Sequence, residues 1–276
     1  MGRGSALGRA PSGPDRGDGS MDDRVERDIA ELKKNPNLPR HIAVIMDGNG
    51  RWAHKHHRPR LAGHRAGTEA VRDTIRASAK LDISALSLFT FSLENWRRPR
   101  LEVEGLMLFL KEVLHSEYLE LKENNIRLRA MGRLDMLPRD TLRVLRETIA
   151  SLSGNSGMIL NLCLSYSGRG EIVDAARKIA RAAWAGELAE ADLDEESFRK
   201  YLYDPELSDP DLLIRTSGEL RISNFLLWQL AYTEIVVTDV LWPDFRAEHL
   251  CDAIRVYLGR ERRFGKVKAG SDHGDE

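Results

Sequence analysis

The chain has 276 residues, of which 42% are hydrophobic and 31% charged, and 42 Lys and Arg against 43 Asp and Glu give a net charge of −1. This composition is typical of a globular protein with a sizeable core. The balanced charge argues against a general nucleic-acid-binding protein, which would be clearly basic. Two cysteines, Cys163 and Cys251, are too few for a disulfide framework or a four-cysteine zinc site.

The sequence predicts one folded domain between two polar ends. Residues 1–20 are rich in Gly, Pro, Ser and Arg and cannot bury a core, so we expect a disordered leader there. Residues 21–265 would form the domain, and residues 266–276 a polar tail. No apolar run reaches the ~18 residues that span a bilayer, and the N-terminus lacks the apolar stretch of a signal peptide. We therefore expect a cytoplasmic protein.

Short apolar segments alternate with stretches of helical periodicity, which predicts an α/β domain with a mostly parallel sheet of about six strands and helices on both faces. The predicted strands are 41–46, 84–90, 126–130, 158–164, 211–214 and 234–238. The predicted helices are 62–80, 102–124, 141–153, 171–184 and 247–262. Ligands bind beyond the carboxyl ends of the strands in such sheets, so the loops after residues 46, 90, 164 and 214 are where we expect a site.

The first of these loops could bind phosphate. Gly48 and Gly50 let the backbone turn and expose N–H groups, and the guanidinium of Arg51 adds donors for the same anion. Asp47 beside a phosphate would need a bridging Mg²⁺. A tight turn explains the Asp-Gly and Asn-Gly pairs equally well. A calcium loop does not fit, because arginines would stand at two of the carboxylate positions.

A basic segment, 54–60, follows this loop and contains three histidines. Its cations would repel a metal ion, so a solvated or anion-facing segment is the better interpretation. In the loop after residue 90, Ser92 or Asn95 could simply cap a helix. After residue 214, Arg215 and Arg221 could clamp a diphosphate, or could form surface salt bridges to neighbouring carboxylates.

Taken together, the motifs resemble those of the cis-prenyltransferase (isoprenyl transferase) family, and above all its bacterial branch that makes undecaprenyl diphosphate. The likeness runs from about residue 38 to residue 265. The matching blocks are HIAVIMDGNGRWA at 41–53, GHRAG at 63–67, FSLENWRRP at 91–99, RTSGELRISNFLLWQLAYTE at 215–234, LWPDF at 241–245 and RERRFG at 260–265.

The resemblance implies specific roles. Asp47 and Asn95 would be catalytic, and Asp47 and Glu234 would hold Mg²⁺. Asn95 stands where a proton acceptor is often assigned, but a neutral amide is a poor base, which favours a positioning role. The allylic diphosphate would be held by Gly48, Asn49, Gly50, Arg51, Arg60 and His64, with Trp52 nearby. The allylic site and the tunnel mouth would be flanked by Ser92, Leu93, Glu94, Trp96 and Arg98. Residues at isopentenyl diphosphate would be Arg215, Arg221, Ile222 and Ser223.

The implied reaction adds isopentenyl diphosphate to an allylic diphosphate, with farnesyl diphosphate as primer and a long product such as undecaprenyl diphosphate, a lipid carrier for cell-wall synthesis. Each buried CH₂ contributes about 0.8 kcal/mol, so the growing chain needs an apolar tunnel. Its expected lining is Leu86, Leu88, Phe89, Leu106, Leu110 and Met158, although ordinary core packing explains each of these residues as well. The resemblance also implies a homodimer in which residues 263–265 reach the other subunit, and transient contact with a membrane surface.

Two positions depart from the family pattern. Leu93 replaces a Ser or Thr that many members have, and His57 replaces a common Gly. Three alternatives remain. A non-catalytic regulatory binding protein of the same fold should lack Asp47, Asn95 or the arginines, and all are present. A member making a shorter product stays open. An unrelated phosphate-binding enzyme would be supported by a G-x-x-x-x-G-K-[ST] loop, which the sequence lacks.

One acidic run needs a separate explanation. Residues 22–26, DDRVE, faintly resemble the Asp-rich diphosphate motif of trans-type prenyl synthases. The run is single and has no partner further along the chain. A helix start with acidic residues in its first turn explains it better.

Overall fold

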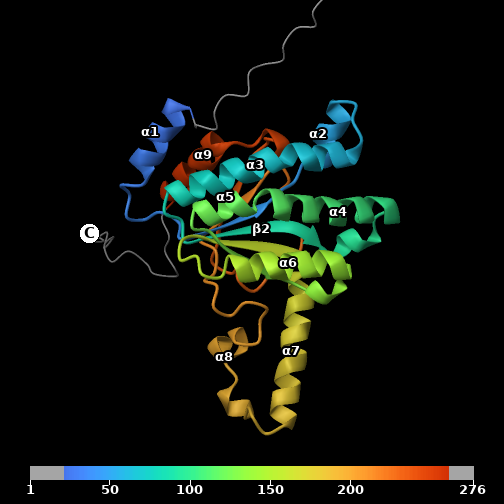
Figure 1. Cartoon of the computed structure of the whole chain (residues 1–276). Coiled ribbons are helices and arrows are strands. Elements are labelled where there is room, and N and C mark those ends of the chain that lie inside the picture. Colours follow the sequence, from blue (N-terminus) through green and yellow to red (C-terminus); the bar gives the residue numbers. More distant parts are fainter. Residues whose placement is uncertain (1–21, 261–276) are drawn as a thin grey trace, which may run out of the picture.

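Six parallel strands organise the structure, a computed structural model that describes residues 22–260 (Figure 1). Their order across the sheet is β3-β4-β2-β1-β5-β6, which confirms the predicted parallel sheet. The expected leader, the polar tail and residues 263–265 lie outside the described residues. The strands are β1 (His41–Ile45), β2 (Ala85–Ser92), β3 (Arg127–Met131), β4 (Ile159–Tyr166), β5 (Leu212–Arg215) and β6 (Glu234–Val237).

Helices connect β1 to β2, β2 to β3, β3 to β4 and β4 to β5, as is usual between parallel strands, whereas residues 216–233 link β5 to β6 without a helix. The α-helices are α1 (Asp23–Leu32), α2 (Asn49–Lys55), α3 (Arg60–Lys80), α4 (Arg100–Ser116), α5 (Tyr118–Glu123), α6 (Arg139–Ser151), α7 (Gly168–Trp184), α8 (Glu195–Arg199) and α9 (Ala247–Leu258). Short 3₁₀ helices are η1 (Leu93–Arg97), η2 (Leu134–Met136), η3 (Glu190–Asp192) and η4 (Trp242–Asp244). Among residues 22–260, no helix combines the length and the apolar character needed to cross a membrane.

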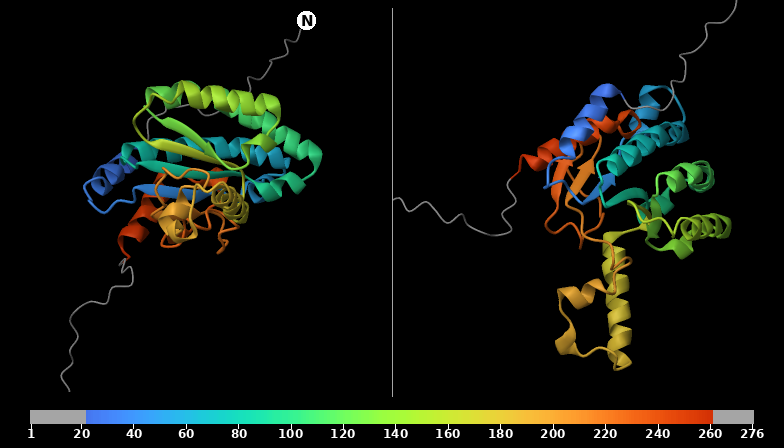
Figure 2. Two further views of the ribbon diagram at one scale, coloured as in Figure 1. Left: turned by 90° about the horizontal axis from the view of Figure 1, so that it is seen from below. Right: turned by 60° about the vertical axis from the view of Figure 1, so that its left-hand side comes forward.

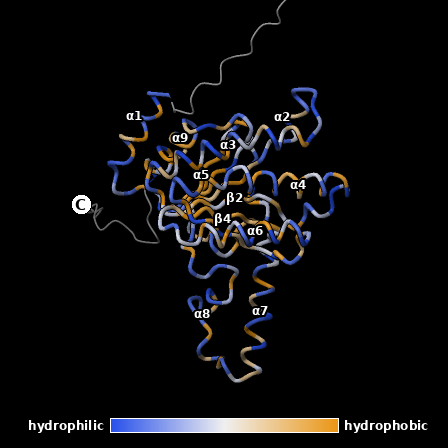
Figure 3. The backbone as a smooth tube through the Cα atoms, viewed as in Figure 1, coloured by the Kyte–Doolittle hydropathy of each residue, from blue (hydrophilic) through white to orange (hydrophobic). Residues whose placement is uncertain are grey.

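The alternation of side chains along β1 divides the core into two parts. Ile42 and Val44 belong to the larger apolar cluster, which includes residues of α3, α4, α6 and α9. Ala43 and Ile45 belong to a smaller cluster on the other side of the strand, which also includes Phe225. Figure 3 shows the hydrophobic residues concentrated along the strands and the hydrophilic ones on the outer turns of the helices.

One predicted element differs in detail. The predicted helix 102–124 is split into α4 and α5, and the buried Glu117 at the junction accepts hydrogen bonds from Arg72 of α3 at 2.8 and 2.6 Å. The acidic run at 22–26 is a helix start, as expected, and Asp22 caps α1 by accepting a hydrogen bond from Arg24 N at 3.0 Å.

An arm extends from this body. Helix α7 starts at the carboxyl end of β4 and projects away from the sheet, and α8 returns alongside it (Figures 1 and 2). Trp184, at the far end of α7, is 93% exposed. The sequence predicted α7 but neither α8 nor the projection.

Candidate active site

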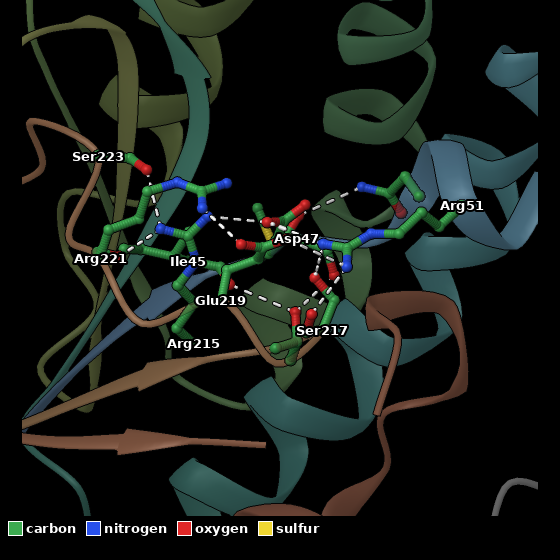
Figure 4. A network of polar contacts seen from close by, with 11 residues as sticks. Ile45, Asp47, Arg51, Arg215, Ser217, Glu219, Arg221 and Ser223 are labelled. Atoms are coloured by element: carbon green, nitrogen blue, oxygen red, sulfur yellow. Dashed lines mark hydrogen bonds and ion pairs between the residues drawn. The ribbon is translucent and has the colours of Figure 1, made fainter. Parts of the chain in front are cut away.

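Three loops meet at the carboxyl ends of β1, β2 and β5, the edge at which the sequence predicted a site. The register pairs Ile45 of β1 with Arg215 of β5, so the residues that follow the two strands leave the sheet side by side. Figure 4 shows Asp47, Arg51, Arg215, Ser217 and Ser223 joined in one polar network at this point.

The centre of the network is the carboxylate of Asp47. Its Oδ2 accepts a hydrogen bond from Arg215 Nη2 at 2.8 Å and lies 3.3 Å from Arg51 Nη2. Burial raises the pKa of Asp47, but the hydrogen bond from Arg215 and the charges of both arginines outweigh it and hold the pKa below its usual value. Asp47 is therefore ionised at neutral pH.

The backbone of the Asp47 loop is fixed from two sides. The carbonyl of Asp47 accepts hydrogen bonds from Trp242 N at 3.0 Å and from Thr216 Oγ1 at 2.6 Å. Gly48 has φ +113°, and a Cβ there would lie 3.0 Å from backbone atoms of Leu241 and Trp242. Glycine is required at this position both by the dihedral angle and by the close approach of η4.

A second group of cations lies where α3 begins and α4 approaches it. Glu102 Oε1 is 3.3 Å from Arg60 Nε and 3.2 Å from Arg98 Nη1. Burial and the charges of Arg98 and Arg60 lower the pKa of nearby His64 to about 4. His64 is thus neutral at physiological pH and offers hydrogen bonds rather than charge beside the two arginines.

An apolar cavity of about 230 Å³ opens from these charged groups. Its polar end comprises Asp47, Gly48, Asn49, Gly50, Arg60, His64, Asn95 and Arg98. The rest is lined chiefly by apolar side chains from β2, β4 and α4. Four of the six expected lining residues are present: Leu88, Phe89, Leu106 and Leu110. Leu86 and Met158 lie instead in the buried core, nearer the amino edge of the sheet.

A second, open pocket lies on the other side of Asp47 and Asn95. Both residues line the apolar cavity and also this pocket, whose further lining includes Ser92, Glu94, Arg215, Ser223 and Asn224. Asn95 Oδ1 accepts a hydrogen bond from Ser92 N at 3.2 Å, so its side chain also closes the first turn of η1. Asp47 and Asn95 thus stand between the two spaces.

Arg51 belongs to a third hollow, next to the basic segment that the sequence singled out. Asp47, Gly48, Gly50, His54, Arg58 and Arg60 also line it. Arg51 donates through Nη1 to the carbonyl of Ser217 at 2.9 Å and through Nη2 to the Ser217 hydroxyl. Glu219 forms ion pairs with Arg51 at 3.4 Å and with Arg221 at 2.5 Å. Arg221 therefore forms one of the surface salt bridges that the sequence left open as an alternative, here with Glu219.

Some expected site residues support the loops rather than line either main pocket. Trp52 donates to Asp244 at 2.8 Å, and Trp96 donates to Ser165 Oγ at 3.1 Å. Ile222 packs against the smaller apolar cluster. Leu93 belongs to η1 and does not line the pockets described above.

The structure does not bring Glu234 to Asp47 within one chain. Glu234 is the first residue of β6, and through Leu212 it is in register with Ile42, near the amino end of β1. Five residues of extended chain separate Ile42 from Asp47, or about 16 Å along the strand direction. Glu234 accepts a hydrogen bond from Arg260 at 2.7 Å instead. Within a single chain, these two carboxylates are therefore too far apart to share a metal ion, and the expected pairing is wrong there.

The chemistry at Asp47 still fits Mg²⁺. Residues 22–260 contain no group of three His, Cys, Asp or Glu side chains placed to hold a metal ion. Mg²⁺, however, is usually bound by one or two carboxylates together with substrate phosphates and water. An ionised carboxylate beside arginines that can hold those phosphates matches this mode, and Asp47 supplies it.

The sequence missed several residues of the network. The site residues are held in place by contacts with Thr216, Ser217, Glu102 and Asn224. Ser217, Ser223 and Asn224 have φ values of +71°, +48° and +63°, which few non-glycine residues adopt. The Ser-Gly and Ser-Asn pairs in this stretch signal a turn, but nothing in the sequence shows which atoms the turn brings together.

Comparison with known proteins assigns the family. The family model for undecaprenyl diphosphate synthase matches residues 45–265. The chain is 52% identical over 236 residues to an isoprenyl transferase of Chlorobaculum tepidum, covering 86% of this chain and 89% of that protein. It is 48% identical over 243 residues to an isoprenyl transferase of Bacillus subtilis, covering 88% and 94%.

Two solved structures share the fold. Lavandulyl diphosphate synthase from Lavandula x intermedia, in complex with dimethylallyl diphosphate, has a TM-score of 0.80 and 36% identity, and the match covers 83% of this chain and 99% of that one. A protein described as a probable undecaprenyl diphosphate synthase from Campylobacter jejuni has a TM-score of 0.70 and 32% identity, with coverage of 83% and 100%. The chain therefore belongs to the undecaprenyl diphosphate synthase family of isoprenyl transferases and is a prenyltransferase.

Proposed function

We propose that the chain condenses isopentenyl diphosphate onto an allylic diphosphate in a Mg²⁺-dependent cis-elongation, with farnesyl diphosphate as primer and a long polyprenyl diphosphate such as undecaprenyl diphosphate as product. One observation carries the proposal. Asp47 and Asn95 line both an apolar cavity with a charged end and an open pocket that contains Arg215 and Ser223. Two diphosphates with different tails fit this division.

The allylic substrate would lie with its tail in the apolar cavity. Its diphosphate would lie among Arg60, His64 and Arg98, with the Asp47 loop on its other side. Mg²⁺ held by Asp47 would supply positive charge to the departing diphosphate. The arginines act in the same sense, because they stabilise the negative charge that develops as the bond from C1 to the diphosphate oxygen breaks.

Isopentenyl diphosphate would lie in the open pocket. Arg215, Arg221 and Ser223 would hold its diphosphate, and its double bond would face C1 of the allylic substrate across Asp47 and Asn95. The electron pair of that double bond forms the new carbon–carbon bond, the diphosphate leaves with the electrons of the broken bond, and a proton leaves the isopentenyl unit. Asn95, already bonded to the η1 backbone, would position the reacting groups.

We also expect the enzyme to be a homodimer in the cytoplasm and to touch a membrane surface when it releases its lipid product. Sedimentation of the purified protein tests the first point. A monomer at concentrations that support full turnover would contradict it. Cofloating with liposomes only while product is being made would support the second.

The reaction is tested with purified protein, farnesyl diphosphate, labelled isopentenyl diphosphate and Mg²⁺. Product is dephosphorylated and separated by chromatography. Labelled chains of defined length, lost when EDTA removes Mg²⁺, are the expected result. Absence of label in product with farnesyl, geranyl and geranylgeranyl diphosphates alike would overturn the proposal in favour of a binding role.

A further inference from the structure

Both the nitrogen and the oxygen of the Asn224 side-chain amide form hydrogen bonds, and these bonds connect three segments around the open pocket. Nδ2 donates to Glu94 Oε1 at 2.9 Å and to Ser167 Oγ at 2.8 Å, and Oδ1 accepts from Arg169 N at 2.9 Å. Its backbone carbonyl accepts from Gly168 N at 2.8 Å. One side chain thus joins η1, the first turn of α7 and the loop after β5.

This residue lies next to a group that we place at the isopentenyl diphosphate. Ser223 Oγ accepts a hydrogen bond from Arg215 Nη1 at 2.8 Å, and Arg215 Nη2 in turn binds Asp47. Ser223 and Asn224 both have φ in the left-handed region, +48° and +63°. Two such residues in succession need outside contacts to stay in place. Ser223 has its contact with Arg215, and Asn224 makes the contacts that reach η1 and the start of α7.

The other end of the connection is Glu94 in η1, the helix that also carries Asn95. Burial raises the pKa of Glu94, but the hydrogen bonds from Asn224, from its own backbone and from Ser92, together with the charge of Arg97, outweigh burial and hold the pKa below its usual value. Glu94 is an anion that accepts a hydrogen bond from Asn224. The contact fixes the distance between η1 and the loop that carries Ser223.

We propose that Asn224 is a positioning residue that holds the Arg215–Ser223 pocket in register with η1, and so sets the affinity for isopentenyl diphosphate without setting that for the allylic primer. The inference rests on the proposed function. Asn224 itself lines only the open pocket, whereas the groups that we assign to the allylic diphosphate, Arg60, His64 and Arg98, line the apolar cavity.

The test variant is Asn224→Asp. Aspartate tolerates a positive φ nearly as well as asparagine and can still accept from Arg169 N. The substitution replaces only the donor atom Nδ2 with an oxygen, so that two carboxylates face each other at positions 224 and 94. We expect the KM for isopentenyl diphosphate to rise about tenfold or more and the KM for farnesyl diphosphate to stay within about twofold.

A reciprocal change should restore the contact. In the double variant with Glu94→Gln, the glutamine amide can donate to the new carboxylate, and the hydroxyl of Ser167 can turn to donate as well. We expect the KM for isopentenyl diphosphate in the double variant to recover at least half of the loss on a logarithmic scale, measured against Glu94→Gln alone. Such a recovery would assign the rise in KM to the contact between positions 94 and 224.

Asn155→Asp is the matched control. Asn155 Nδ2 donates to the Ile126 carbonyl at 2.7 Å in a part of the chain that lines none of the three pockets described above. The control should lower the thermal midpoint without separating the two KM values. Binding of isopentenyl diphosphate alone, followed by calorimetry, gives the same comparison without turnover.

The outcomes separate the two claims. A wild-type protein that makes no product overturns the proposed function and, with it, this inference. Wild-type condensation with unchanged kinetics in Asn224→Asp overturns only the inference. So does a variant with a lowered thermal midpoint whose two KM values rise together and which Glu94→Gln does not rescue.

Discussion

Arg215 and Asp47 stand 168 residues apart in the sequence, and their side chains meet at 2.8 Å where β5 and β1 end side by side. The side chain of Arg215 is only 4% exposed. A buried cation of this kind needs its partner, because an unpaired charge in a site shielded from water is costly. The pair therefore fixes the centre of the site before any substrate arrives.

Asp47→Ala should abolish turnover. It removes the carboxylate that we assign to Mg²⁺ and leaves Arg215 without its partner, and loss of one such electrostatic contact typically costs about 100-fold or more in rate. The measurement is incorporation of labelled isopentenyl diphosphate at saturating Mg²⁺. Asp82→Asn, which changes an exposed carboxylate paired with Lys33, is the control and should behave as wild type. Unchanged turnover in Asp47→Ala would refute the Mg²⁺ role.

Gly63→Ala should impair catalysis through the backbone. A Cβ on Gly63 would lie 2.0 Å from the carbonyl oxygen of Asn49, so α3 and the Asp47 loop must move apart. A misplacement of about 1 Å can cost on the order of 100-fold in rate. Gly154→Ala is the matched control, because a Cβ there meets no atom within 4 Å. Rates that are equal in the two variants would show that the loop tolerates the shift.

Leu110→Phe should shorten the product. Leu110 lines the apolar cavity, and a larger side chain there takes space from the growing chain. Leu108, on the same helix but 52% exposed, provides the control Leu108→Phe. Chromatography of dephosphorylated products should show a shift to shorter chains only in the first variant. An identical product distribution in both would mean that the chain does not occupy this cavity.

The free energy of unfolding should fall as the pH is lowered from 7 to 5. Burial lowers the pKa of His41 to about 4 against contacts that raise it, and Nε2 of this histidine faces Ser87 Oγ at 2.8 Å. The unfolded chain takes up a proton near pH 6.5, whereas the folded one does not until about pH 4. The contribution of His41 to stability is therefore fully present above pH 6.5 and is lost as the pH falls from 6.5 towards 4. Between pH 7 and pH 5 one such histidine lowers the free energy of unfolding by about 2 kcal/mol.

Urea unfolding at pH 7 and pH 5 measures this loss. His64, with its pKa also lowered to about 4, adds to it in the same direction. A His41→Gln variant will be less stable at both pH values, but the difference between them should shrink. The exposed His115→Gln is the control and should keep the wild-type difference. A His41→Gln difference equal to that of wild type would assign the loss to other groups.

The sheet could be predicted because its strands are buried on both faces and appear as short apolar runs between helical stretches. The ends of the elements follow less directly from the sequence. The Asn-Gly pair at 49–50 indicates a turn, yet Asn49 begins α2, because contacts of Trp242 and Thr216 with Asp47 hold the chain in a tight transition from strand to helix. Those contacts come from residues far along the sequence.

The part of the site that could be predicted from the sequence is the part formed by residues near the carboxyl ends of strands. Asp47, Arg215 and Asn95 lie at or shortly after the carboxyl ends of strands, and the structure gathers them at one edge. Glu234 was assigned by resemblance alone, although its place at the start of a predicted strand already put it at the opposite edge. The hydrogen bonds of Asn224 could not be predicted, because they depend on left-handed backbone and on three segments that meet only in the fold.

Because all strands of the sheet are parallel, the site lies at one edge and the opposite, amino edge is free for chemical labelling. Ser153 is exposed in the turn before β4, and the eight residues of that strand place it roughly 26 Å from the loops that carry the site. Cys163 and Cys251 are both buried. A cysteine introduced at Ser153 would thus be the accessible thiol among the described residues, and a fluorophore attached there would report on the protein in solution without touching its chemistry.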